Sequence, residues 1–273
     1  MNSFDQYLNE QIESFDDSKI RTAMLYCNEG GKHFRPNVIF SIMKGFGKNE
    51  EDAYAGAAAL EFIHNYSLIH DDLPGMDNDN FRRGKLSCHR QFGEDIAILT
   101  GDAFLTHAFS VISESDYSDR LKVDLINVLT RYAGLYGMIY GQLLDVTCSH
   151  DIDPETLFEI QDNKTSGLFK AACLIAMYIA GNDDYAFFEK LGSKIGVVFQ
   201  NQDDLFDIIK SEEETGKSNS DIRNKKITAL SFKSVDELKE YIAYLFVDLK
   251  KYLKRAPFDP KYILEIIEMM EKR

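Results

Sequence analysis

Residues 51–84 read EDAYAGAAALEFIHNYSLIHDDLPGMDNDNFRRG, and this stretch does most to decide the fold. Its first part, Glu51 to His70, is rich in alanine, the residue with the highest helix propensity, and therefore predicts a strong helix. Pro74 and Gly75 should end that helix. The segment that follows is densely charged, and it is the first candidate for a functional site.

Four carboxylates lie within nine residues at the end of this helix: Asp71, Asp72, Asp77 and Asp79. The ordinary interpretation of such a cluster is a solvated acidic loop. A calcium-binding EF-hand is excluded, because counting from Asp77 puts Arg82 and Cys88 where the glycine and the glutamate of that loop must stand. Basic residues follow at once, and dense charge of both signs suits a metal-bound polyanion.

A second acidic cluster, QNQDDLFD at residues 200–207, lies inside a helical pattern. Asp203 and Asp207 are four residues apart and therefore share a helix face, which Gln200 joins. Like charges at this spacing destabilise an isolated helix by roughly a few tenths of a kcal/mol, so a cation should offset them. Hard oxygen ligands without a nearby histidine or cysteine favour Mg²⁺ over zinc.

Beyond these clusters, the apolar spacing is helical almost throughout. Further helices are expected at Phe4 to Phe15, Val38 to Met43, Glu94 to Ser113, Leu121 to Thr147, from Asp153-Pro154-Glu155 onward, and at Asp183 to Ile209, Val235 to Leu253 and Pro260 to Met270. The polar segment from Ser211 to Thr228 is expected to be a loop. No alternating β-branched run predicts a strand, and no linker divides the chain. We therefore expect an all-α protein with one domain over residues 1–273.

The composition of the 273-residue chain restricts its partners. Lysine and arginine number 31 against 45 aspartates and glutamates, and the net charge of −14 disfavours general nucleic-acid binding. The four cysteines form no CxxC pair, so reduced thiols are expected rather than a zinc site. The N-terminus shows no signal-peptide pattern, and the apolar stretch Ala171 to Ala180 is too short to span a bilayer. We therefore expect a cytoplasmic protein without stable membrane insertion.

Basic residues elsewhere are compatible with an anionic substrate. The sequence GGKHFRP at residues 30–36 combines a glycine pair, which lets backbone amides approach a ligand, with Lys32 and Arg35. An ordinary turn before a helix explains this sequence equally well. The remaining candidates, each unremarkable alone, are Lys164, Thr165, Lys217 and His64. A solvated lysine and a histidine satisfied in the core are their ordinary interpretations.

Taken together, these motifs resemble the trans-isoprenyl diphosphate synthases, the chain-elongating prenyltransferases. Residues 61–84 look very like the first aspartate-rich motif of bacterial farnesyl diphosphate synthases, GGKHFRP resembles the family's GGKRxRP, and QNQDDLFD resembles the second aspartate-rich motif. Three shorter motifs fall at the family's order and spacing: Gly141-Gln142 with Asp145, Lys164-Thr165, and Thr215-Gly216-Lys217. The resemblance covers most of the chain, from about residue 30 to residue 228.

This resemblance implies an isoprenoid synthase fold, with about ten antiparallel helices around a deep central cavity, in a homodimer. The two aspartate motifs would face each other across the cavity mouth. The implied cofactor is Mg²⁺, about three ions per active site with substrate bound, with Mn²⁺ as a substitute. The implied metal ligands are Asp71, Asp72, Asp77, Asp203 and Asp207, and Asp204 and Lys164 join them as implied catalytic residues.

The implied substrates are isopentenyl diphosphate and an allylic diphosphate, either dimethylallyl or geranyl. The allylic diphosphate would be held by Arg82, Lys164 and Lys217, with Thr165 and Gln200 nearby. Isopentenyl diphosphate would be held by Gly31, Lys32, Arg35, His64 and Arg83. Departure of the allylic diphosphate leaves a carbocation, which the isopentenyl double bond attacks, and the released diphosphate would take up the proton. Metal ions and basic side chains stabilise the charge on the leaving group.

The implied product is farnesyl diphosphate. Tyr66, followed by Ser67, lies five residues before Asp71, about 7 Å along a helix. In the family, a bulky aromatic residue there tends to stop chain growth at fifteen carbons. The alternatives are that Tyr66 only packs in the core, and that the product is geranylgeranyl or geranyl diphosphate.

The chain departs from the family pattern at a few positions. His33 replaces an arginine, Asn78 and Asn80 replace aspartates, and Ala229-Leu230 replaces an aromatic residue and a proline. These changes bring into question the closing loop and the C-terminal packing, but not the metal chemistry.

Three other functions are alternatives. A terpene cyclase would share the first carboxylate motif but would lack GGKHFRP. A non-catalytic subunit of a heteromeric prenyl synthase usually loses one aspartate motif, whereas this chain keeps both. A helical structural protein would tolerate the loss of Asp71 or Asp203.

Overall fold

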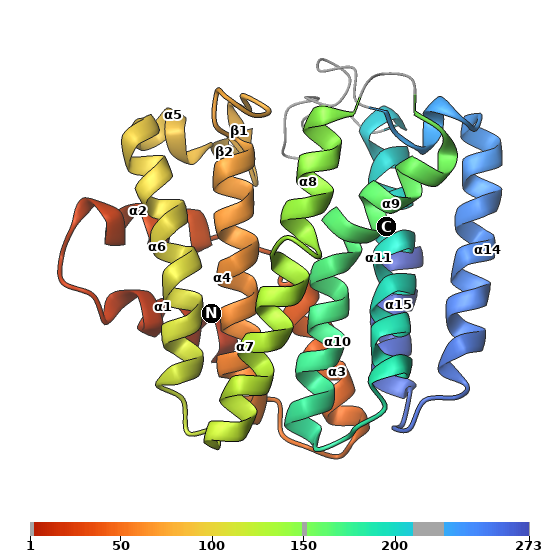
Figure 1. Ribbon diagram of the computed structural model, residues 1–273, viewed down its shortest axis with the longest axis horizontal. Coiled ribbons are helices and arrows are strands. Elements are labelled where there is room, and N and C mark those ends of the chain that lie inside the picture. The colour runs from red at the N-terminus through yellow and green to blue at the C-terminus, as the bar shows by residue number, and fades with distance from the viewer. Residues whose placement is uncertain (1–2, 149–151, 210–226, 273) are drawn as a thin grey trace. The chain divides into compact units, whose positions relative to one another are not determined.

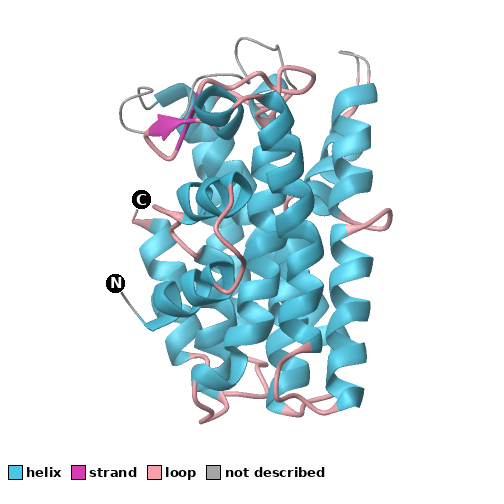
Figure 2. Cartoon of the chain, turned by 90° about the vertical axis from the view of Figure 1, so that its left-hand side faces the viewer, coloured by secondary structure: helices cyan, strands magenta, loops and turns pink. Residues whose placement is uncertain are grey.

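The computed structural model describes residues 3–148, 152–209 and 227–272. Helices account for most of this part of the chain, as the cyan segments of Figure 2 show. The chain divides into two compact units, each assembled from separate stretches of sequence. The first unit comprises residues 1–33, 54–116 and 209–226, and the second comprises residues 34–53, 117–208 and 227–273. The single domain expected over residues 1–273 stays a prediction.

The first unit is built around two long helices that lie side by side, α4 and α6 (Figure 1). Its elements are α1 (Ser3–Glu13), α2 (Lys19–Asn28), α4 (Tyr54–Asp71), β1 (Phe81–Arg82), β2 (Lys85–Leu86), α5 (Cys88–Phe92) and α6 (Glu94–Ser113). The ring of Phe62 lies 5.4 Å from those of Phe104 and His107, and these contacts join α4 to α6. Helix α4 is buried along most of its length because alanine allows neighbouring helices to approach closely.

Helix α1 covers this core with the apolar stripe that its spacing predicts. Phe4, Leu8 and Ile12 are buried. The helix ends at Glu13, however, and Phe15 lies beyond it with 40% of its surface exposed. The expected helix was therefore two residues too long at its C-terminal end.

The second unit is organised around α10, which packs against α3, α7, α8 and α9. Its elements are α3 (Phe34–Gly45), η1 (Glu51–Ala53), α7 (Asp119–Ala133), α8 (Met138–Thr147), α9 (Pro154–Lys164), α10 (Ser166–Ala180), α11 (Tyr185–Ile209), η2 (Ala229–Ser231), α14 (Val235–Leu253) and α15 (Lys261–Glu271). The apolar stretch in α10 is buried over nearly its whole length, which explains why this helix lacks a polar face.

Two expected helices are divided in the structure. The pattern from Leu121 to Thr147 forms α7 and α8, because Gly134 and Gly137 separate them. A Cβ atom at Gly137 would lie 2.1 Å from the carbonyl oxygen of Tyr132, so only glycine permits this close return of the chain. The pattern from Glu51 likewise begins with the short helix η1 before α4. These divisions, together with α2 and α5, which no expected range covers, raise the number of helices among the described residues above the number expected.

Several helix ends lie where the sequence predicts them. Helices α6 and α14 have the expected bounds. The Asp153 side chain accepts a hydrogen bond of 2.7 Å from the backbone N–H of Thr156, and Pro154 begins α9, as the cap pattern predicts.

A short hairpin, β1–β2, was not expected. Phe81 pairs with Leu86 and Arg82 with Lys85. The two turn residues, Arg83 and Gly84, have φ values of 55° and 76°, as in a two-residue hairpin turn. Strands of two residues are too short to show an alternating pattern, so the sequence carried no signal for them.

Among the described residues, α6 is the one helix that is long and apolar enough to cross a bilayer. Buried core helices also meet this length and composition criterion, and α6 packs along α4. The expectation of no stable membrane insertion stays a prediction.

Candidate active site

The first aspartate-rich segment folds back on the end of α4. The backbone N–H of Asp77 donates to the carbonyl of Asp71 at 2.9 Å, and that of Asp79 donates to the carbonyl of Asp72 at 3.2 Å. Asn78 adopts a left-handed conformation, with φ of 53°, which asparagine tolerates better than most residues. The turn therefore brings Asp71 next to Asp77 and Asp72 next to Asp79.

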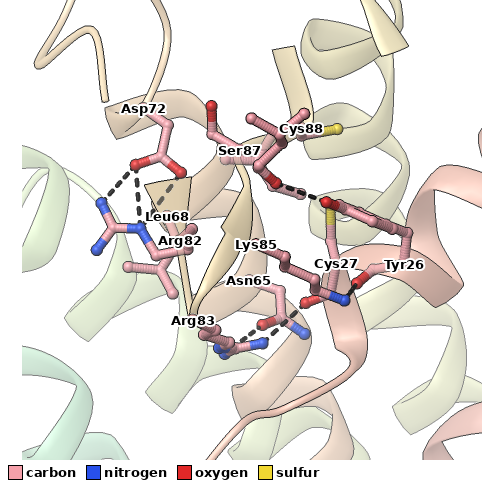
Figure 3. Close-up of a pocket in the computed structure, with 12 residues that line it drawn as sticks. Tyr26, Cys27, Asn65, Leu68, Asp72, Arg82, Arg83, Lys85, Ser87 and Cys88 are labelled. Carbon is pink, nitrogen blue, oxygen red and sulfur yellow. Dashed lines mark hydrogen bonds and ion pairs between the residues drawn. The ribbon is translucent and has the colours of Figure 1, made fainter. Parts of the chain in front are cut away.

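These two pairs differ in their surroundings. Asp71 and Asp77 are partly exposed, whereas Asp72 and Asp79 are buried. The buried pair contacts Arg82, whose Nε donates to Asp72 Oδ1 at 3.1 Å (Figure 3). Arg82 Nη2 lies 3.3 Å from Asp79 Oδ2. Burial raises the pKa of Asp72 to about 6, although Arg82 acts in the opposite direction. The buried pair, Asp72 and Asp79, is called the inner pair and anchors the turn. The partly exposed outer pair, Asp71 and Asp77, is available to a ligand.

Helix α11 carries the second aspartate cluster with a similar division. Asp203 and Asp207 are partly exposed, one helical turn apart. Asp204 is buried and accepts hydrogen bonds from the side chains of Gln200 at 2.7 Å and Gln161 at 3.1 Å. It also accepts one of 2.9 Å from the backbone N–H that opens η2. Asp204 is therefore buried away from the exposed side of α11 that carries Asp203 and Asp207, and its catalytic role stays a prediction.

The carboxylates suit Mg²⁺, which prefers oxygen ligands. Among the described residues, no group of three or more histidine, cysteine, aspartate or glutamate side chains is arranged to hold a metal ion without other ligands. Mg²⁺ commonly binds proteins through one or two carboxylates together with substrate phosphates. Asp71 with Asp77, and Asp203 with Asp207, each provide two partly exposed carboxylates.

Lys164 and Thr165 lie at the junction of α9 and α10, which Gly141 in α8 approaches closely. A Cβ atom at Gly141 would lie 2.2 Å from the backbone nitrogen of Lys164, so glycine is required there. Asp145, one turn further along α8, binds Lys164 Nζ at 2.5 Å. The Thr165 hydroxyl donates to Gln200 Oε1 at 2.5 Å. The structure thus brings five predicted residues together in the second unit, Gly141, Asp145, Lys164, Thr165 and Gln200.

The glycine-lysine segment places its basic residues differently. Lys32 is exposed, whereas Arg35, in the second unit, is buried with its guanidinium 4.8 Å from the centre of the Phe169 ring. His33 has φ of 44°, and its two ring nitrogens each lie 2.9 Å from a carboxylate, that of Glu61 and that of Asp5. Burial lowers the pKa of His33, but the hydrogen bond that the ring donates to Glu61 and the charges of both carboxylates raise it more, so the net shift is upward.

Helix α4 also carries His64, Tyr66 and Ser67. His64 is partly exposed, and the Ser67 hydroxyl donates to its carbonyl at 2.8 Å. Tyr66 is buried, with its ring centre 5.8 Å from that of His70. Burial, together with the charge of Asp71, raises the pKa of Tyr66 to about 12. Tyr66 is therefore a neutral aromatic group below the first aspartate motif.

A comparison with known proteins decides the family. The sequence model described as Polyprenyl synthetase matches residues 17–268. The chain belongs to the polyprenyl synthetase family. Among its relatives, the farnesyl diphosphate synthase of Micrococcus luteus is 40% identical over 82% of this chain and 79% of its own. A chloroplastic geranylgeranyl pyrophosphate synthase of Catharanthus roseus is 34% identical over 98% of this chain and 77% of its own.

The fold of this polyprenyl synthetase is confirmed by solved structures. A geranyltransferase from Helicobacter pylori, complexed with magnesium and isoprenyl diphosphate, superposes with a TM-score of 0.87 at 27% identity. The alignment covers 99% of this chain and 97% of that one. Both the predicted family and the all-α isoprenoid synthase fold are therefore confirmed, and the structural-protein alternative is wrong.

A pocket in the first unit of this polyprenyl synthetase contains residues that the motifs did not single out (Figure 3). Arg83 Nη2 donates to Asn65 Oδ1 at 3.0 Å, and its Nη1 donates to the carbonyl of Cys27 at 2.8 Å. Lys85 donates to Glu29 Oε2 at 3.0 Å and to the carbonyl of Tyr26. Asn65 is a polar residue inside an apolar helix, and that signal could have identified it.

One predicted binding residue, Lys217, and its neighbours Thr215 and Gly216 lie outside the described residues. The loop expected from Ser211 to Thr228 lies mostly there too. The role of Lys217 stays a prediction.

Proposed function

We propose that the protein condenses isopentenyl diphosphate with dimethylallyl and geranyl diphosphate to form farnesyl diphosphate, in a Mg²⁺-dependent reaction. The observation that carries the proposal is the turn after α4, in which the backbone N–H of Asp77 donates to the carbonyl of Asp71 and both aspartates are partly exposed. The relative from M. luteus is named a farnesyl diphosphate synthase, and the structural neighbour from H. pylori is complexed with magnesium.

Two kinds of side chain would bind the diphosphates: carboxylates, through Mg²⁺, and basic groups, directly. Bound Mg²⁺ would neutralise diphosphate and stabilise it as a leaving group. Asp71 and Asp77 in the first unit, and Asp203 and Asp207 in the second, would hold the ions. We take their number to be about three, with Mn²⁺ as a substitute.

Basic side chains would complete diphosphate binding. Asp145 orients Lys164 through their 2.5 Å ion pair, so this ammonium group is positioned before substrate arrives. Lys32 is exposed and would bind isopentenyl diphosphate. The reaction needs no dedicated side-chain base, because the released diphosphate can take the proton that the condensed carbocation loses as the new allylic diphosphate forms.

Tyr66 is our proposed determinant of product length, with Ser67 beside it. Its buried phenol lies on α4 one and a half turns before Asp71, where a growing chain attached to a diphosphate would meet it. Geranylgeranyl diphosphate is the second candidate product, because relatives with that name also match nearly the full chain.

One incubation tests the proposal. Purified protein receives Mg²⁺, labelled isopentenyl diphosphate and either dimethylallyl or geranyl diphosphate, and the dephosphorylated products are separated by length. A fifteen-carbon alcohol supports both the reaction and the role of Tyr66. A twenty-carbon alcohol keeps the reaction and contradicts that role. No product with either primer would contradict the proposed activity and favour a non-catalytic subunit.

A further inference from the structure

Gln161 is a buried polar residue in the last turn of α9 that no motif singled out. Only 8% of its surface is exposed, and its backbone carbonyl accepts the N–H of Thr165 at 3.1 Å. Its side-chain Nε2 donates to Asp204 Oδ2, on α11, at 3.1 Å. A buried amide is expected to have such a partner. Gln161 therefore joins the end of α9 to the second aspartate motif.

Four residues of the second unit form a closed ring of hydrogen bonds: Gln161, Thr165, Gln200 and Asp204. Each helical segment contributes two residues that are four apart, so each pair shares one face. Across the segments, Gln161 bonds Asp204, and the Thr165 hydroxyl donates to Gln200 Oε1 at 2.5 Å. The bond of Gln200 Nε2 to Asp204 Oδ1, at 2.7 Å, closes the ring along α11. Each member is thus held by two others.

The ring fixes the orientation of the Gln200 amide. Both carboxylate oxygens of Asp204 accept N–H groups, and Oδ2 also accepts the backbone N–H of Ala229 at 2.9 Å. The amide of Gln200 therefore turns its NH₂ group toward Asp204 and its carbonyl oxygen toward the hydroxyl of Thr165. Among these bonds, the one from Gln161 is the side-chain link between α9 and Asp204. Without it, the ring opens between α9 and α11.

We propose that Gln161 is a positioning residue, which holds the junction of α9 and α10 against α11 so that Lys164 and Asp203 bind one Mg²⁺-bound diphosphate together. The inference rests on the proposed prenyltransferase function. Lys164 directly precedes Thr165, and Asp203 directly precedes Asp204, so each of these two binding residues is the neighbour of a ring member. The ring therefore sets the separation between the basic group and the carboxylate.

The contribution of Gln161 differs from that of Asp145. Asp145 orients the ammonium group of Lys164 from α8, whereas the ring sets the position of the backbone that carries Lys164 relative to α11. Residues that orient metal-binding groups without touching the metal contribute about ten- to a hundred-fold to affinity or activity. Loss of the Gln161 amide should therefore weaken the binding of Mg²⁺-diphosphate measurably.

The test removes the amide while keeping the length of the side chain. Isothermal titration calorimetry measures the binding of inorganic diphosphate in the presence of Mg²⁺, without turnover. We expect the Kd to rise about ten-fold in Gln161→Met and to change by less than about two-fold in Gln161→His. The His variant keeps a donor, because Nε2 of histidine and Nε2 of glutamine are the same number of bonds from Cβ. Gln161→Asn, whose amide is too short to reach Asp204, should also raise the Kd, and it decides the test if Gln161→Met does not fold.

Gln202→Met is the matched control. Gln202 is also buried, on α11, and its Nε2 donates to the carbonyl of Met270 at 2.9 Å, outside the ring. Loss of this bond should lower the melting temperature about as much as Gln161→Met does, because each variant loses one buried hydrogen bond. The Kd for diphosphate should stay that of the wild type in Gln202→Met. A purely structural role of Gln161 would give the same result for both variants.

Steady-state kinetics extend the test to the reaction. In Gln161→Met the KM for geranyl diphosphate should rise about ten-fold, and the KM for isopentenyl diphosphate should change by less than about two-fold, because the ring adjoins Lys164 rather than Lys32. An unchanged Kd in the Met and Asn variants overturns the inference, and so does an equal rise in Gln202→Met or Gln161→His. A wild type that binds Mg²⁺-diphosphate but makes no prenyl product contradicts the proposed function alone, while calorimetry still decides the role of Gln161. A wild type that binds no diphosphate overturns both.

Discussion

Asp71 and Asp72 are neighbours in the sequence, but their carboxylates are in different environments. Asp72 is buried and paired with Arg82, whereas Asp71 is partly exposed beside Asp77. The same division separates Asp204 from Asp203 and Asp207. Within each motif, therefore, some carboxylates hold the local structure and others are available to a ligand, and substitutions should separate the two roles.

Replacing an outer carboxylate should abolish turnover without unfolding the protein. We expect Asp71→Ala and Asp203→Ala to lower kcat by about 100-fold or more, because each removes a ligand for the ions that stabilise the leaving diphosphate. The melting temperature should change little, since neither carboxylate is buried. Steady-state kinetics and circular dichroism measure the two effects. Asp236→Ala, at an exposed position of α14, is the control and should keep full activity. Near-normal turnover in both active-site variants would contradict the assignment.

Replacing Tyr66 should change the product rather than the rate. In Tyr66→Ala the buried phenol is removed, and chain growth should continue to twenty carbons. The loss of a buried aromatic side chain should also cost about 3 kcal/mol of stability, so the assay is run well below the melting temperature. Product sizing by chromatography decides the outcome. A fifteen-carbon product from the variant would mean that another group limits chain length.

At the scale of elements, His33 connects α1 to α4 through Asp5 and Glu61. Because the pKa of His33 is raised in the folded protein, this connection contributes full stability below the unfolded pKa of about 6.5 and loses it as pH rises through the higher folded value. We expect the free energy of unfolding to fall by about 1 kcal/mol through this range. Urea titrations between pH 5 and pH 9 measure it. His33→Gln should remove this part of the pH dependence, and an unchanged profile in that variant would contradict the interpretation.

Gly141 sets the distance between α8 and the junction of α9 and α10. In Gly141→Ala the added methyl group would lie 2.2 Å from the backbone nitrogen of Lys164, so α8 must move and the Asp145–Lys164 ion pair must lengthen. We expect a loss of about 1 to 3 kcal/mol in stability and a rise in the KM for the allylic substrate. Gly75→Ala, where an added Cβ meets nothing within 4 Å, is the control for stability. Equal melting temperatures for the two variants would show that α8 relaxes without cost.

The sequence predicts long elements better than short ones. The bounds of α6 and α14 follow from apolar periodicity over many residues, and the start of α9 follows from its cap. The division of α7 from α8 depends on a close approach to the carbonyl of Tyr132, which no local pattern reports. The same holds within the site. The aspartates are visible as clusters, whereas the contacts of Arg83 with Asn65 and Cys27 join residues far apart in the chain.

At the scale of the whole molecule, an exposed apolar face on α6 indicates self-association. Ile98 and Leu99 are 45% and 53% exposed on one of the most apolar helices of the chain. We propose a homodimer, with a mass of 2 × 31.2 = 62.4 kDa by light scattering. Leu99→Glu should shift the protein toward 31.2 kDa, because a charge would be buried without a partner at the interface. Val247→Glu, at an apolar position of α14 that is 64% exposed, is the control and should remain a dimer. A wild-type mass of 31.2 kDa at micromolar concentration would contradict the homodimer, and a dimer unaffected by Leu99→Glu would place its interface on another face.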